Sequence, residues 1–207
     1  MSSRFAIVLS GLVLCIAGSV HPAHGQEPSY FTLSGGWAWP GAGPVKDVYE
    51  SGFTGAASFR TPAAPNYLYG FEVGYSWLTL DTGKLAGEHA GSSFSGGDFG
   101  LLSVTTEHDY IIGQRANAAR PFVNLGLGYF ASFSDDTSVT TGTTSASFAT
   151  GVYEGSFFGL HGGGGLLIPL ARFGLRIDAN YQHLFAAGED LGFWVGRIGI
   201  VLYPRKV

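Results

Sequence analysis

The stretch that decides the fold runs from Arg120 to Phe133 and reads Arg-Pro-Phe-Val-Asn-Leu-Gly-Leu-Gly-Tyr-Phe-Ala-Ser-Phe. Bulky apolar residues fill one set of alternate positions, and glycine or small polar residues fill the other, apart from Phe130. This is the period-two pattern of a β-strand. Its length exceeds the ~5–6 residues of an average strand and covers the ~9–11 that a tilted strand needs to cross a bilayer. We therefore predict a strand whose apolar face meets lipid and whose small face lines a narrow barrel.

Composition supports a β-rich and weakly charged protein. The chain has 207 residues, of which 33 are Gly and 13% are charged. Globular proteins average ~7% Gly and ~25% charged residues. The net charge of −4 and the lack of a basic stripe argue against nucleic-acid binding. At this length one domain is expected.

Residues 1–25 have the pattern of a signal peptide. Arg4 precedes an apolar run from Phe5 to Ala17, and the small residues around Gly25 suit a cleavage site. The run is too short for a membrane-spanning helix, which needs ~20 residues. We expect cleavage after residue 25, with residues 26–207 forming the folded domain. The lone cysteine, Cys15, would then be lost, and export without disulfides fits a bacterial envelope protein.

The mature chain divides into eight segments of alternating hydrophobicity, and the predicted fold class is therefore an all-β, eight-stranded antiparallel up-and-down transmembrane barrel. The expected strands are Tyr30–Trp39, Phe53–Arg60, Tyr69–Leu80, Leu101–Ile111, Arg120–Phe133, Phe157–Leu170, Leu175–Phe185 and Phe193–Tyr203. The Gly/Ser-rich residues 83–98 are expected to form a loop. The Ser/Thr/Gly tract Asp135–Gly155 is either a mobile loop or an extension of its flanking strands.

The connections between these strands alternate in length. Those at 40–52, 81–99, 134–156 and 186–192 are mostly long, whereas those at 61–67, 112–119 and 171–174 are shorter. Outer-membrane barrels have short periplasmic turns and longer extracellular loops. The alternation therefore predicts that both termini are periplasmic.

Four segments resemble the small eight-stranded outer-membrane barrels, the OmpA-like and opacity-type surface-protein superfamily. They are the stretch starting at Arg120, Gly162–Gly165, Arg176–Tyr181 and Gly199–Tyr203. The resemblance implies residence in the outer membrane with lipopolysaccharide and lipid as neighbours, and insertion by the barrel-assembly machinery. That machinery usually reads a terminal aromatic residue, whereas this chain continues past Tyr203 as Pro-Arg-Lys-Val.

Six charged residues fall on the face predicted to line the barrel. Eight strands leave an interior just wide enough for side chains, and charges buried there must be paired. We expect a structural network of three positive and three negative groups that plugs the lumen. Its members are Arg60, Glu72, Glu107, Arg176, Asp178 and Arg197. The alternative is a gated, low-conductance pore or a bound polar solute.

Catalytic and metal sites are not expected. His183 and Glu189 could serve a lipid A-modifying hydrolase or acyl transferase, but no Gly-x-Ser-x-Gly motif is present. The neighbours Glu107, His108 and Asp109 could suggest a metal site, but consecutive strand residues point to opposite faces. His161 could join the lumen charges.

Aromatic residues near strand ends are expected to form interfacial girdles. They are Tyr30, Trp37, Trp39, Tyr75, Trp77, Tyr129, Tyr181, Trp194 and Tyr203. The sequence thus favours a non-enzymatic outer-membrane barrel, without a cofactor, that presents surface loops for adhesion or envelope integrity and could bind a host or surface ligand. The alternatives are a lipid A-modifying enzyme and a soluble periplasmic barrel that binds an apolar ligand.

Overall fold

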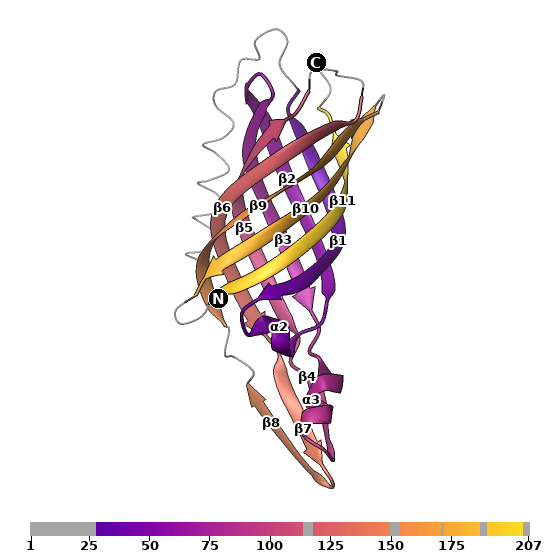
Figure 1. The fold of residues 1–207 in the computed structure, drawn as a ribbon, viewed down its shortest axis with the longest axis vertical. Helices are drawn as coiled ribbons and strands as arrows, with labels where there is room; N and C mark the ends of the chain where they lie inside the picture. The colour runs from indigo at the N-terminus through magenta and orange to yellow at the C-terminus, as the bar shows by residue number, and fades with distance from the viewer. Residues whose placement is uncertain (1–27, 114–117, 150–153, 171, 187–189, 205–207) are drawn as a thin grey trace.

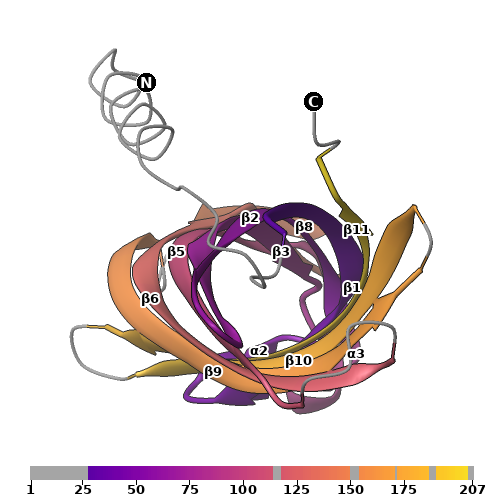
Figure 2. The same ribbon diagram turned by 90° about the horizontal axis from the view of Figure 1, so that it is seen from above.

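The computed structural model describes residues 28–113, 118–149, 154–170, 172–186 and 190–204. The predicted signal peptide lies outside this part of the chain. Within it, eight long strands close into an antiparallel barrel in the order β1-β11-β10-β9-β6-β5-β3-β2 (Figures 1 and 2). Their bounds are β1 Tyr30–Ala42, β2 Gly52–Ala64, β3 Tyr67–Leu78, β5 Phe99–Ile111, β6 Arg120–Ser134, β9 Gly155–Pro169, β10 Phe173–Phe185 and β11 Leu191–Leu202.

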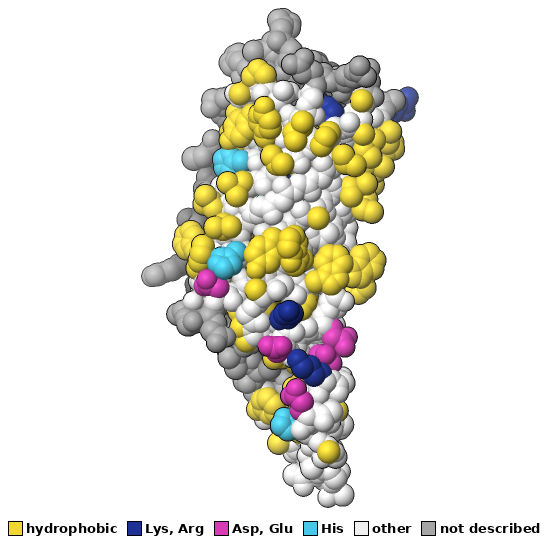
Figure 3. Space-filling model, viewed as in Figure 1, with side chains coloured by type: hydrophobic (Ala, Val, Ile, Leu, Met, Phe, Trp, Pro, Cys, Tyr) yellow, Lys and Arg dark blue, Asp and Glu magenta, His cyan; other side chains and the backbone are white. Residues whose placement is uncertain are grey.

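The predicted fold class is confirmed, and the alternation of residue types explains it. Leu33, Leu125 and Ile198 are about 60% exposed on the outside of the barrel, whereas their chain neighbours of the opposite alternation face inward. On the face shown in Figure 3, hydrophobic side chains gather in two bands on the outer surface of the barrel. Among the described residues, no helix is long and apolar enough to cross a membrane.

The two ends of the barrel differ in their connections. The register pairs Tyr30 with Arg60 and Phe31 with Leu202, so β1 begins and β11 ends beside the β2–β3 turn. That turn is tight because Pro65 is followed by Asn66, which takes a positive φ of 62°. We call this the turn end. The opposite end carries the longer connections after β1, β3 and β6, and we call it the loop end.

The loop end carries structure that the sequence did not predict. Residues 83–98 contain most of α3 (Thr82–Glu88) and the strand β4 (Ser92–Gly96). The prediction that these residues form a loop was therefore wrong. The tract Asp135–Gly155 holds the hairpin β7 (Asp136–Thr141) and β8 (Thr144–Ala149). These strands form a separate sheet in the order β4-β7-β8, which projects from the barrel (Figure 1).

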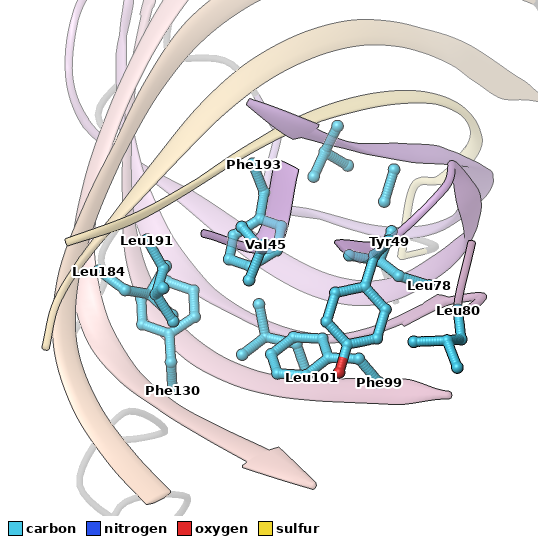
Figure 4. Close-up of a cluster of buried hydrophobic side chains, with 12 residues drawn as sticks. Val45, Tyr49, Leu78, Leu80, Phe99, Leu101, Phe130, Leu184, Leu191 and Phe193 are labelled. Carbon is cyan, nitrogen blue, oxygen red and sulfur yellow. The ribbon is translucent and has the colours of Figure 1, made fainter. Parts of the chain in front are cut away.

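An apolar layer fills each end of the barrel interior. At the loop end, Phe99, Phe130 and Phe193 pack with Val45 of the short helix α2 (Val45–Val48) and with Tyr49 (Figure 4). Phe130, the exception in the deciding stretch, is therefore a plug residue. At the turn end, a second cluster consists of Tyr30, Leu68, Ile111, Phe122, Leu167 and Val201. The six charged residues predicted to line the lumen lie between these two layers.

Candidate functional site

The structure places all six predicted lumen charges inside the barrel. Each is at most 6% exposed, and they come from five different strands. They are Arg60 on β2, Glu72 on β3, Glu107 on β5, Arg176 and Asp178 on β10, and Arg197 on β11.

Three arginines and three carboxylates form a closed ring of alternating charge, which we call the lumen ring. Asp109 lies 2.8 Å from Arg60 and 2.6 Å from Arg176. Asp178 lies 3.2 Å from Arg176 and 3.1 Å from Arg197. Glu72 supplies the third carboxylate: it is paired with Arg197 and lies 3.6 Å from Arg60, which closes the ring. Each charge thus has two partners of opposite sign, which offsets the cost of removing it from water.

The predicted membership of three positive and three negative groups was incomplete. Asp109, which the prediction omitted, completes the lumen ring. Glu107 is a branch that lies 3.0 Å from Arg60 and 3.1 Å from His161 of β9. The signal was available in the sequence, because Asp109 stands two positions after Glu107 and side chains two apart on a strand share a face.

Tyr30 was wrongly assigned to the interfacial girdles. It is 1% exposed inside the barrel, where its hydroxyl accepts a hydrogen bond of 3.4 Å from Arg176. The same guanidinium stacks on the ring of Phe122 at 3.8 Å from the centroid. Tyr203 packs edge-on against Tyr30 and is half-buried. At the turn end, the lumen ring is therefore in contact with the aromatic residues Tyr30 and Phe122, through Arg176.

Most of the other predicted girdle residues do face outward, and several of them pack on an aromatic ring of a neighbouring strand. Near the loop end, Trp194 packs on Tyr181 with centroids 5.0 Å apart, and Trp37 packs on Phe53 at 5.6 Å. A second row near the turn end is built from Phe31, Phe59 and Phe71, with centroids 4.8 and 6.1 Å apart. The prediction missed this row because it counted only Trp and Tyr.

The residues considered for catalysis and metal binding are split between the two faces of the barrel wall, because Glu107 and Asp109 face the lumen whereas His108 and His183 do not. His183 is on the outer face, with its Nε2 3.1 Å from a carboxylate oxygen of Asp190, while Glu189 lies outside the described residues. His108 faces outward and is hydrogen-bonded to the Tyr67 hydroxyl at 2.6 Å, so it points away from Glu107. In the described part of the chain, no three His, Cys, Asp or Glu side chains could hold a metal ion.

Comparisons with known proteins show which solved structures share this fold. No family model and no curated protein matches the chain. Among solved structures, Neisserial surface protein A covers 87% of the chain with 100% of its own length, at a TM-score of 0.56 and 14% identity. OprG from Pseudomonas aeruginosa covers 88%, with all of its own chain, at 0.51 and 15%. A major outer-membrane protein from Thermus thermophilus covers 85%, with 99% of its own chain, at 0.50 and 12%. The chain therefore has the fold of the small eight-stranded outer-membrane barrels.

Proposed function

We propose that this chain is a non-enzymatic barrel of the bacterial outer membrane that holds a β-sheet at the cell surface for adhesion or envelope integrity. The observation that carries the proposal is the distribution of polarity: apolar and aromatic side chains cover the outside, and the lumen ring is buried inside. Membrane barrels have such an apolar band with aromatic girdles. A soluble barrel for an apolar ligand needs the reverse arrangement, so the buried Arg60, Arg176 and Arg197 count against it.

The orientation follows from the two ends. Short connections of outer-membrane barrels face the periplasm and longer ones face outward. The turn end, where β1 begins and β11 ends, is then periplasmic, and both termini lie on that side. The β4-β7-β8 sheet is extracellular, and the loop-end girdle lies at the level of lipopolysaccharide. A host or surface ligand would meet this sheet first.

Transport fits the interior poorly. The lumen ring crosses the barrel, and the apolar layers around Phe130 and Phe122 fill both of its ends. A water-filled pore needs a continuous polar path, whereas each layer here is a packed cluster. The interior therefore serves as a stabilising plug.

A lipid A-modifying enzyme is the second candidate, and one observation favours it: His183 is oriented by Asp190 near the loop end of β10. Nucleophilic catalysis would also need a hydroxyl within hydrogen-bond reach of the imidazole. In the described residues, the hydrogen bond of His183 goes to the carboxylate alone. Mass spectrometry of lipid A should therefore find the same species in cells that make wild type and His183→Ala. A species lost in the variant would favour the enzyme.

Surface display is tested by epitope accessibility on intact cells. One epitope is inserted between Gly142 and Thr143 at the β7–β8 tip, and a matched one between Pro65 and Asn66 at the turn end. We expect antibody to label the first on intact cells and the second only after the outer membrane is permeabilised. Labelling of the Pro65 site alone on intact cells would contradict the proposed orientation.

A further inference from the structure

The sheet at the loop end finishes in an open edge. β8 pairs with β7 in continuous antiparallel register from Thr141↔Thr144 to Asp136↔Ala149. In the described part of the chain, no strand pairs with the other side of β8. Residues Thr144 to Phe148 are exposed. An edge strand of this kind presents backbone N–H and C=O groups that can pair with another strand.

This edge lacks the usual protection. Natural proteins shield edge strands with Lys, Pro, bulges or a covering element. From Thr137 to Ala149 the chain contains no charged residue and no proline, and the β7–β8 register has no bulge. The opposite edge strand, β4, lies beside α3 (Figure 1), where the rings of His89 and Phe94 pack 5.9 Å apart. The open side of β8 is thus distinguished from the other edge of the sheet.

The chemistry of the edge suits a second copy of itself. Two β8 strands carry no charge that would repel, and Ser and Thr side chains that face each other across antiparallel strands stabilise the pairing. A two-fold axis makes the same patch meet itself. Antiparallel pairing would continue the arrangement of the whole β4-β7-β8 sheet into one six-stranded sheet.

The direction of β8 determines where that copy stands. In Figure 1, β8 slants across the long axis of the molecule, in the sheet that projects beyond the barrel, and its direction has a large component along that axis. A two-fold axis along the membrane normal preserves this component, so two β8 strands in one membrane could not run antiparallel. A two-fold axis within the membrane plane reverses it. We propose that β8 is a self-recognition strand that pairs antiparallel with β8 of a copy in a facing membrane. This inference rests on the proposed function, because it needs the sheet outside the cell.

The test uses the full barrel, one copy per lipid nanodisc. Both faces of a nanodisc are open, and two barrels in separate discs can bring their β8 strands together only with the loop ends facing. We expect wild-type discs to form pairs of doubled mass as concentration rises, measured by sedimentation. Wild-type discs that remain single at every concentration would overturn the proposal.

Ser147 gives a variant aimed at the open edge. The β7–β8 turn has two residues and a positive φ of 60° at Gly142, and in such hairpins hydrogen-bonded and non-hydrogen-bonded pairs alternate from the turn. This alternation directs the N–H of Ser147 away from β7. Ser147→Pro should therefore abolish disc pairing, whereas Ser147→Ala keeps the N–H and should pair as wild type. Equal pairing by both variants would overturn the proposal.

Because Ser147→Pro can also disturb the β7–β8 hairpin, a second test uses oppositely charged variants at the same position. Discs of Ser147→Lys and discs of Ser147→Glu should each remain single, and their mixture should pair. A mixture that stays single would overturn the inference. Electrophoresis with and without heating distinguishes failure of self-recognition from failure of the proposed function. A barrel whose mobility changes on heating but whose discs do not pair refutes self-recognition alone. A chain whose mobility does not change on heating refutes the proposed function as well.

Discussion

The guanidinium of Arg176 on β10 lies 2.6 Å from the carboxylate of Asp109 on β5, although β9 and β6 stand between these strands in the barrel. The two residues are 67 positions apart in the chain. Their contact crosses the lumen and closes the ring that also contains Arg60 and Asp178. The interior is therefore tied together by side chains as well as by the strand ladder.

Removing one carboxylate of the lumen ring should cost more than removing an exposed one. Asp109→Asn leaves two buried guanidiniums short of a partner, and breaking a buried pair costs about 3–5 kcal/mol. We expect a drop of this order in the free energy of unfolding, measured in urea with lipid vesicles. The double variant Asp109→Leu/Arg176→Met should lose less than the sum of its single variants, because each single variant leaves the other member of the Asp109–Arg176 pair without this partner, whereas the double variant removes both members.

Asp47 supplies the control for that series. Its side chain is 79% exposed and lies 3.5 Å from Lys84 at the loop end. Asp47→Asn should change the free energy of unfolding by less than about 0.5 kcal/mol. Equal losses for Asp109→Asn and Asp47→Asn would mean that the lumen ring contributes nothing specific.

The four consecutive glycines of β9, Gly162–Gly165, should differ sharply in their tolerance of alanine. A Cβ on Gly165 would stand 1.9 Å from the backbone oxygen of Ile177, whereas a Cβ on Gly162 meets nothing closer than 3.5 Å. Gly165→Ala forces the β9 and β10 backbones apart, at a cost of about 1–3 kcal/mol or more. Gly162→Ala should fold like wild type. The yield of folded barrel in vesicles distinguishes them, and comparable yields would contradict the packing described here.

A charge on the outer face should prevent stable insertion. Leu125 is 60% exposed in the middle of β6, and arginine near the bilayer midplane of a barrel costs about 2–4 kcal/mol. Leu125→Arg should make the free energy of folding into vesicles less favourable by this amount, whereas Ser95→Arg, on exposed β4, should have little effect. Improved solubility of Leu125→Arg without loss of stability would instead indicate a barrel that folds in water.

Because its interior is filled, the barrel should not conduct ions. Because apolar clusters fill both ends and the lumen ring fills the space between them, wild-type barrels in a planar bilayer should give no discrete conductance steps. Barrels refolded from a pure preparation and inserted at known density provide the measurement, with empty detergent as the control. Regular steps that scale with protein density would show an open path through the lumen.

The barrel could be predicted from the sequence because its signal is strong and local. From Tyr69 to Trp77, and across the Arg120–Phe133 stretch, bulky apolar residues on the outer face alternate with mostly small or polar residues that face the narrow interior. The β7–β8 hairpin has no such signal, because Ser and Thr stand on both of its faces. Its pairing with β4, which precedes it by about 40 residues, depends on tertiary contacts.

The lumen ring could be predicted in part. Alternation identified which charges face inward, but pairing depends on the stagger of the closed barrel, which brings together residues from β2, β5 and β10. The position of Tyr30 was also beyond prediction from the sequence. Its residue type and its place at a strand end are the same whether the ring faces outward or packs inside the barrel against Arg176.

The most direct test of the central claim is fractionation of cells that make the full-length protein, followed by electrophoresis of the outer-membrane fraction with and without boiling. A closed membrane barrel stays folded in cold detergent and changes mobility after heating. We expect the protein in the outer-membrane fraction with a heat-dependent shift. Recovery in the soluble periplasmic fraction, with the same mobility before and after boiling, would contradict the assignment of the apolar face to lipid.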